Sequence, residues 1–219
     1  MKNTKLTVKP IQPVITRTQA KGQLRIKEDE VSEDQFIDDL IPQATRIVEL
    51  LARRQFITAT YIKSLQEFHD NRNVKHPSDS HEIDHHDHNS LSDVIILEHP
   101  PLQSVEEIKY IDTDGNEQIL DLNDIQIDTF NEPGRIKPAF GKSWPSARKE
   151  FNSVLITYKA GYGDDESKMP DEVKRAVKLM VSHYFENRDL VLTMNDVEQI
   201  EFPIGLMTII NQFGLSEFQ

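Results

Sequence analysis

The sequence predicts an α+β fold, in which a helical core is combined with a small, mainly antiparallel β-sheet. Apolar residues recur at helical spacing in two long stretches, one beginning near residue 32 and one near residue 170, and we expect these helices to pack together. Between them lie short runs of branched and aromatic residues separated by Gly, Pro, Asn and Ser, which is typical of strands joined by turns. The chain has 219 residues, a length that suits one domain.

Two helices are expected near the start of the chain. Thr16 and Gln19 have the spacing of a capping box, which predicts a short helix from that point. Ser32 and Gln35 repeat the spacing ahead of the first long apolar stripe, so a longer helix should begin there. Pro42 falls inside this stripe, where a kink or a split would be its usual effect.

The middle of the chain is expected to form the sheet. An Asp114-Gly115 pair is the signal of a two-residue type I′ turn, which predicts a hairpin over 106–122. The remaining runs with strand character are 56–62, 94–97, 125–130, 135–136 and 154–159. A stretch rich in His and Asp, about 69–92, has too few apolar residues to offset its ordering entropy and is expected to be a flexible loop.

Helical patterns return in the last third. Pro170 opens a helix whose wide apolar stripe runs to about Asn187. A final segment from Pro203 to Gly214 is apolar nearly all round, and a short helix of that kind must be buried against its own domain or against a partner.

Composition excludes several classes of protein. The chain has no cysteine, which removes disulfides, thiolate metal sites and cysteine nucleophiles. No stretch approaches the length of a membrane helix, and the first residues lack the apolar core of a secretory signal, so we expect a cytosolic chain without a membrane partner. The formal net charge of -12 opposes nucleic-acid wrapping.

Histidines are concentrated in one region, since all but one of the eight lie between residues 69 and 99. Four of them, interleaved with acidic residues, are candidate ligands for Zn, Ni or Cu ions: His81, His85, His86 and His88. Their spacing does not match a closed tetrahedral site, so a solvated insertion is favoured over a metal site.

No catalytic arrangement is found. GxSxG and HExxH motifs are absent, and Gly161-Tyr162-Gly163 lacks the Lys and Ser/Thr of a phosphate loop, so these glycines are expected to end a strand. His183 lies on the late helix and is interpreted as a structural or interface residue. We therefore expect neither enzymatic activity nor a cofactor.

Trp144 is the single tryptophan, and it lies in a stretch rich in Gly, Pro and Ser. It is either a loop anchor packed on the sheet or a hot spot at a subunit interface, and the sequence leaves both interpretations open.

Several motifs, taken together, give the sequence a resemblance to a known family. These are the segments around Pro101, Gly134-Arg135-Ile136, Trp144-Pro145, Ala160-Gly161-Tyr162-Gly163 and Glu186-Asn187-Arg188. Over about residues 11–190 the chain resembles the head-tail connector (adaptor, head-completion) proteins of long-tailed bacteriophages and gene-transfer particles. The stretch 69–92 looks longer than this family usually carries, which suits a loop insertion.

The resemblance implies a structural role in the virion neck. Such proteins form a homo-oligomeric ring, commonly of twelve copies, beneath the portal protein of a DNA-filled capsid, and they bridge it to the next neck or tail-completion protein. The chain would be made in the host cytoplasm, and genomic DNA would pass through the ring without sequence-specific binding. A metal-binding protein built on the histidine loop is the alternative.

Family members often engage the portal through their C-terminal region, which makes the apolar segment near the end of this chain a candidate for docking. The candidate residues are Ile204, Leu206, Met207, Ile210, Phe213, Leu215 and Phe218. The alternative is a helix packed on its own bundle. The resemblance thus implies one adaptor domain over 1–219, with a flexible loop at about 69–92 and a docking segment at about 190–219.

Overall fold

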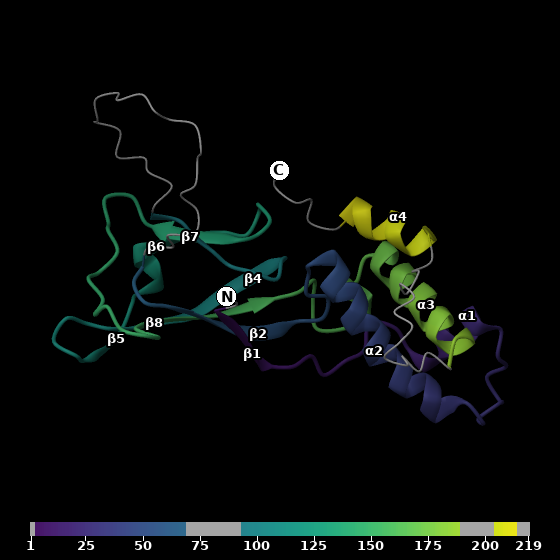
Figure 1. Ribbon diagram of the computed structural model, residues 1–219. Helices are drawn as coiled ribbons and strands as arrows, with labels where there is room; N and C mark the ends of the chain where they lie inside the picture. Colours follow the sequence, from purple (N-terminus) through teal and green to yellow (C-terminus); the bar gives the residue numbers. More distant parts are fainter. Residues whose placement is uncertain (1–2, 69–92, 189–203, 214–219) are drawn as a thin grey trace, which may run out of the picture. The chain divides into compact units, whose positions relative to one another are not determined.

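The computed structural model describes residues 3–68, 93–188 and 204–213, and they form two compact units (Figure 1). Unit 1 consists of Met1–Lys9 and Ala59–Ala160, and unit 2 consists of Pro10–Thr58 and Gly161–Gln219. The chain therefore passes between the units three times, and neither unit is continuous in sequence.

Unit 1 contains a five-stranded antiparallel sheet. Its strands, in spatial order, are β1 (Thr4–Val8), β2 (Ala59–Leu65), β8 (Val154–Ala160), β4 (Leu102–Ile111) and β5 (Glu117–Ile119). Every second residue of β2 and β8 is buried, which places Tyr61, Ile156 and Tyr158 on one covered face. The edge strand β1 was not predicted from the sequence because none of its residues is buried.

A second, three-stranded sheet completes unit 1. Its order is β3 (Ile95–Ile96), β7 (Arg135–Pro138) and β6 (Ile125–Asp128), with the short 3-10 turn η3 (Leu122–Asp124) leading into β6. Ile95, Ile125 and Ile136 join the same apolar cluster as the buried face of β2 and β8. The sequence predicted one small sheet, and the structure has two because the β6–β7 hairpin pairs with β3 and not with the larger sheet.

The hairpin between β4 and β5 is confirmed, but its turn is wider than predicted. The N–H of Asp112 donates to the carbonyl of Asn116 at 2.9 Å, and the N–H of Gly115 donates to the carbonyl of Asp112 at 3.0 Å. This is a three-residue loop, with Gly115 at φ +90°. The Asp112 carboxylate accepts the N–H groups of Asp114 and Asn116, which holds the wider turn in place of the type I′ turn.

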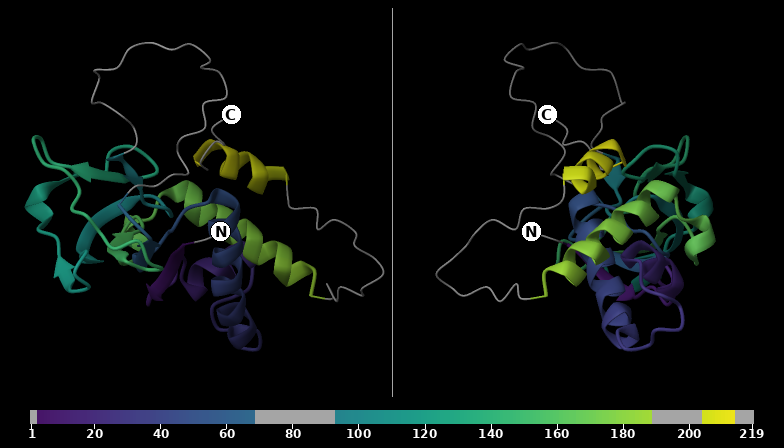
Figure 2. Two further views of the ribbon diagram at one scale, coloured as in Figure 1. Left: turned by 60° about the vertical axis from the view of Figure 1, so that its left-hand side comes forward. Right: turned by 90° about the vertical axis from the view of Figure 1, so that its right-hand side faces the viewer.

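Unit 2 is helical (Figure 2). Its helices are α1 (Arg17–Leu24), α2 (Asp34–Ala52), α3 (Asp171–Glu186) and α4 (Ile204–Phe213), and a 3-10 turn, η4 (Glu166–Lys168), precedes α3. The longest helix, α2, contacts each of the other three, and α4 lies along α3. Their apolar faces form one buried cluster, so the chain as a whole is α+β.

The first predicted helix cap is confirmed and the second is wrong. At the start of α1, the N–H of Gln19 donates to Thr16 Oγ1 at 3.2 Å and the N–H of Thr16 donates to Gln19 Oε1 at 3.4 Å. At the start of α2, Ser32 and Gln35 form no such box, because Glu33 occupies the N-cap position without a side-chain hydrogen bond.

The turn between α1 and α2 is held by a buried lysine. Lys21 is 3% exposed, and its ammonium group donates to the carbonyls of Glu28 at 3.2 Å and Glu30 at 2.7 Å. It also forms an ion pair with Asp34 at 2.5 Å. Arg17 binds the same end of α2 through Asp34. Charged groups therefore take the place of the missing cap.

Residues 56–58 were read from the sequence as the start of a strand, but β2 begins only at Ala59. The preceding residues pair with the segment after β8: the N–H of Tyr162 donates to the carbonyl of Phe56 at 2.7 Å, and the N–H of Thr58 donates to the carbonyl of Gly163 at 2.8 Å. Gly161 adopts φ +131°, and β8 ends just before it, which confirms that these glycines terminate a strand.

Candidate interaction site

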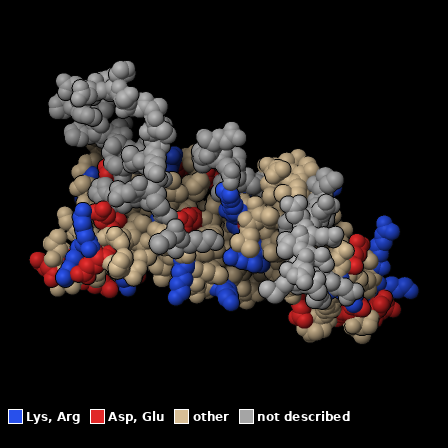
Figure 3. All heavy atoms as spheres, in the orientation of Figure 1, with Lys and Arg blue, Asp and Glu red and all other residues tan. Residues whose placement is uncertain are grey.

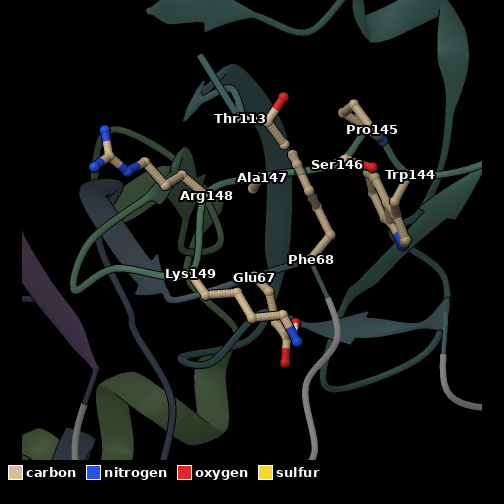
Figure 4. Close-up of a pocket in the computed structure, with 9 residues that line it drawn as sticks. All are labelled: Glu67, Phe68, Thr113, Trp144, Pro145, Ser146, Ala147, Arg148 and Lys149. Carbon is tan, nitrogen blue, oxygen red and sulfur yellow. Dashed lines mark ion pairs between the residues drawn. The ribbon is translucent and has the colours of Figure 1, made fainter. Parts of the chain in front are cut away.

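A hollow of about 510 Å³ lies in unit 1, at the end of the large sheet where β4 turns into β5 (Figure 4). It is lined by residues from the segment just after β2, the hairpin loop and the segment that precedes β8: Glu67, Phe68, Thr113, Trp144, Pro145, Ser146, Ala147, Arg148 and Lys149. Trp144, the ring-interface candidate, is thus brought beside residues that are distant in sequence.

Aromatic rings form one wall of the hollow. Trp144 stacks on Phe68 with ring centroids 4.9 Å apart and planes inclined by 10°, and Tyr110 meets Phe68 edge-on at 5.5 Å. The indole N–H of Trp144 donates to the carbonyl of Asp93 at 2.8 Å. Such pairs add about 0.5–1.5 kcal/mol each beyond the area they bury, so they stabilise this wall.

Backbone pairing fixes the other wall. The N–H of Arg148 donates to the carbonyl of Ile111 at 2.9 Å, and Ala147 forms an antiparallel bridge with Asp112. The segment 144–149 therefore extends the large sheet beside the β4–β5 hairpin.

Charged side chains lie at the rim. Lys149 forms an ion pair with Glu67 at 3.1 Å, and Figure 4 shows the two side chains next to each other. Arg148 pairs with Glu150 at 2.8 Å and extends away from the aromatic wall. An apolar wall with a charged rim suits the binding of an apolar or aromatic side chain, and it offers no nucleophile with an adjacent base.

Three phenylalanines of unit 1 expose nearly their whole side chains. Phe130 is 93% exposed, Phe140 is 99% exposed and Phe151 is 85% exposed. Sequence reasoning did not identify them as exposed: Phe130 was included in the predicted strand run 125–130, but β6 ends at Asp128, and Phe140 and Phe151 belong to no periodic pattern.

The docking candidates on α4 serve the core of unit 2. Leu206 and Ile210 are buried, together with Ile209, and Met207 is partly buried against the same cluster. Ile204 and Phe213 are the first and last residues of α4. Leu215 and Phe218 lie outside the described residues. The burial agrees with a helix packed on its own bundle, and the docking role stays a prediction.

The four histidines proposed as metal ligands lie outside the described residues. Within residues 3–68, 93–188 and 204–213, no group of three or more His, Asp and Glu side chains is placed to hold a metal ion. In the same part of the chain, no helix has the length and apolar character needed to cross a membrane. His183, on α3, lies with its Nδ1 atom 3.5 Å from Asn187 Nδ2.

One carboxyl group of unit 2 has a strongly perturbed environment. Glu49 is 7% exposed, and its Oε1 atom accepts the N–H of Phe56 at 3.0 Å and the side-chain amide of Gln55 at 2.7 Å. Burial raises the pKa of Glu49 to about 7, against the hydrogen bond from Phe56 and the charge of Arg46, which lower it. The group closes the turn after α2, so its role is structural.

Comparison with known proteins identifies the fold. No protein-family model matches the sequence, and no curated protein matches it. Among solved structures, a chain in the "Neck of empty GTA particle computed with C6 symmetry" has a TM-score of 0.73 and 18% identity, with coverage of 99% of this chain and 97% of that chain.

Two further structures agree. A chain of the "Virion of native gene transfer agent (GTA) particle" gives a TM-score of 0.72 at 16% identity, covering 99% of this chain and 97% of that chain. A chain of the "Neck of native GTA particle computed with C12 symmetry" gives a TM-score of 0.63 at 17% identity, and the match covers 98% of this chain and 98% of that chain. At these identities the likeness establishes a shared fold along nearly the whole chain.

Proposed function

We propose that this chain is a non-enzymatic structural protein of a virion neck, a head-tail adaptor that lies under the portal and connects the DNA-filled head to the next neck or tail-completion protein. The observation that carries the proposal is the likeness to chains in the neck and in the virion of gene transfer agent particles, which extends over 99% of this chain. The head-tail connector motifs of the sequence support the same role independently.

The protein acts as a homo-oligomeric ring, for which we propose twelve copies. The support is that the neck particles with this fold were computed with C6 and C12 symmetry. A closed ring needs a heterologous interface, in which one patch of each copy meets a different patch of the next. The hollow beside Trp144 is our candidate for one of these patches, and the two units together make one adaptor subunit.

DNA passes through the ring without specific binding. The formal net charge of -12 supports this, because an acidic protein does not gain the counterion release that drives adhesion to DNA. Acidic and basic side chains alternate at the end of unit 1 that carries β5 (Figure 3). There the ammonium group of Lys109 lies 3.3 Å from the carboxylate of Glu107 and 3.9 Å from that of Glu117, so its positive charge is balanced locally.

The portal contact is assigned to the C-terminal region. Since Leu206 and Ile210 are committed to the core of unit 2, we place the contact on the exposed side of α4, with Asn211 and Gln212, and on the residues that follow, including Leu215 and Phe218. The metal-binding alternative rests on histidines outside the described residues and stays a prediction.

The decisive experiment is to mix the purified protein with the portal protein encoded by the same genome and to image the product by cryo-electron microscopy. We expect a ring of this chain stacked on the portal. Absence of any complex, with both proteins folded by circular dichroism, would contradict the proposal.

Two truncations separate docking from folding. Deleting 214–219 leaves α4 intact, and we expect a folded protein that no longer joins the portal; continued joining would contradict the C-terminal assignment. As the matched control, replacing 69–92 by a short Gly-Ser linker should leave joining unchanged.

Calorimetry with Zn or Ni on the untagged protein tests the metal-binding alternative, which requires a stoichiometric site that is lost when the four candidate histidines are replaced.

A further inference from the structure

Phe130 stands on a loop that is held rigid by hydrogen bonds. We call residues 129–134, between β6 and β7, the Phe130 loop. The Asp128 carboxylate accepts the N–H groups of Phe130 and Asn131, both at 3.1 Å, the side-chain amide of Asn131 at 2.8 Å, and Arg135 Nε at 2.9 Å. These bonds, led by that of the Asn131 side chain, hold the pKa of Asp128 well below its usual range. The backbone at Phe130 is therefore held in place, and its ring projects into solvent.

An exposed aromatic side chain on a held backbone makes a good binding anchor. Ordering a mobile loop at an interface costs free energy, and that cost is avoided when the backbone is already held, so only the Phe side chain has to be ordered on binding. A Phe side chain also brings a large apolar area, about 150–250 Å², to whatever it contacts. The 93% exposure of Phe130 means that the described residues of its own unit leave this area uncovered.

The hollow beside Trp144 offers the complementary surface. The half-buried Trp144 ring is backed by the buried Phe68, which is 2% exposed, and the volume of about 510 Å³ has room for another aromatic ring against Trp144. A third ring placed here would extend the stack and displace water from an apolar surface.

The anchor and the hollow lie at opposite ends of unit 1. The Phe130 loop ends at Gly134, where an added Cβ would be only 2.4 Å from Leu102, the first residue of β4. The hollow is built at the other end of β4, where Arg148 binds Ile111. Ten strand residues span roughly 30 Å, so Phe130 cannot reach the hollow of its own chain.

Position distinguishes Phe130 from the other exposed aromatics. Phe151 lies only two residues after Lys149, which lines the hollow. Phe140 follows the end of β7 that is opposite the Phe130 loop, where the N–H of Ala139 donates to the carbonyl of Asp124 at 2.9 Å.

We propose that Phe130 of one copy inserts against Trp144 in the hollow of the next copy. Because each copy carries the anchor at one end of unit 1 and the hollow at the other, the contact repeats head to tail and closes when the copies form a ring. The occupant of the hollow is therefore a second copy of this chain. The inference rests on the proposed ring and adds which side chains join its subunits.

Cross-linking tests the contact directly, because the chain has no cysteine. Thr129→Cys and Ser146→Cys are prepared as separate exposed single variants, mixed, assembled with the portal and treated with a short bis-maleimide. We expect a covalent dimer of the two variants. The matched control replaces Thr129→Cys by Ser143→Cys, next to the hollow itself, and should give little dimer.

A second pair of variants tests the anchor. Phe130→Ala should abolish the cross-link in the Thr129→Cys background and should raise the protein concentration for half-assembly about 10-fold or more. Phe140→Ala, at a position equally exposed, should change neither. Because both side chains are exposed, melting temperatures should match the parent protein.

The outcomes separate this inference from the proposed function. Rings seen by electron microscopy without the cross-link, or weakened by Phe140→Ala and not by Phe130→Ala, would overturn the contact and leave the neck role standing. Failure of the parent protein to form rings with the portal would overturn the proposed function, and this inference with it.

Discussion

Glu49 makes the stability of unit 2 depend on pH. Its folded-state pKa of about 7 lies above the ordinary value of 4.5, so the folded protein holds a proton that the unfolded chain has already lost between these two values. The corresponding stabilisation is fully present below pH 4.5 and is lost as the pH rises to 7. It amounts to at most about 3 kcal/mol for a shift of this size.

Glu49→Gln keeps an oxygen that can accept the N–H of Phe56 and removes the titration. We expect the variant to melt several degrees above the parent protein at pH 8 and close to it at pH 5, measured by calorimetry. Glu28→Gln, at an exposed position, is the control and should show no such difference. A gain that is equal at both pH values would contradict the role of the buried charge.

Gly161 and Gly22 should respond to alanine in opposite ways. A Cβ at Gly161 would lie 2.8–2.9 Å from backbone atoms of Phe56, Ile57 and Thr58, and φ is +131°. Gly161→Ala should therefore cost at least about 2–4 kcal/mol. Gly22 is exposed within α1 with nothing within 4 Å, so Gly22→Ala should add about 0.5–1 kcal/mol. Urea unfolding of the two variants measures both, and a tolerated Gly161→Ala would mean that the segments can separate.

At the scale of elements, the start of α1 shows what a cap contributes. Thr16→Ala removes the oxygen that accepts the N–H of Gln19 and should cost about 1 kcal/mol. Thr18→Ala, an exposed position inside the same helix, should instead stabilise by a few tenths, because Ala has the higher helix propensity. Equal changes in the free energy of unfolding of both variants, measured with urea, would show that the cap does not stabilise the helix.

Local signals were predictable, and pairings between distant segments were not. Apolar periodicity found α2 and α3, and α2 runs unbroken through Pro42, which the sequence marked as a place for a kink or a split. Residues 56–58 looked like the start of a strand, but their partner, the segment after β8, could not be read from local pattern. The second sheet was missed for the same reason, because the pairing of β7 with the distant strand β3 leaves no local pattern in the sequence.

Buried charges escaped sequence reasoning as well. Lys63 is 1% exposed on the covered face of β2, where the sequence gives no reason to expect a lysine. Its charge is compensated there because the Glu98 carboxylate lies 3.6 Å from its ammonium group. The candidate site was found only in part: Trp144 could be singled out as the one tryptophan, but Phe68 and Thr113 join it only through the fold.

At the scale of the whole molecule, the buried apolar residues fall into two clusters, one in each unit. Leu206→Ala should cost about 2–5 kcal/mol in the cluster of unit 2. Hydrogen exchange should then speed up in α2 and α3 while the sheet amides of unit 1 keep their protection. Ile108→Ala, fully buried in unit 1, should give the reverse pattern. Uniform acceleration in both units would show that they open together.

The discontinuity of unit 2 has a consequence for biosynthesis. A nascent chain that has just completed α2 at Ala52 must be extended to Asp171 before its main packing partner, α3, begins to leave the ribosome. At about 5–20 residues per second, this takes roughly 6 to 24 s, during which α1 is the one helix of the described part of unit 2 that can cover the apolar stripe of α2. Unit 1 can close its large sheet once β8 emerges, whereas unit 2 must wait for α3 and α4. The α2 stripe is therefore the segment on which chaperones should act during translation.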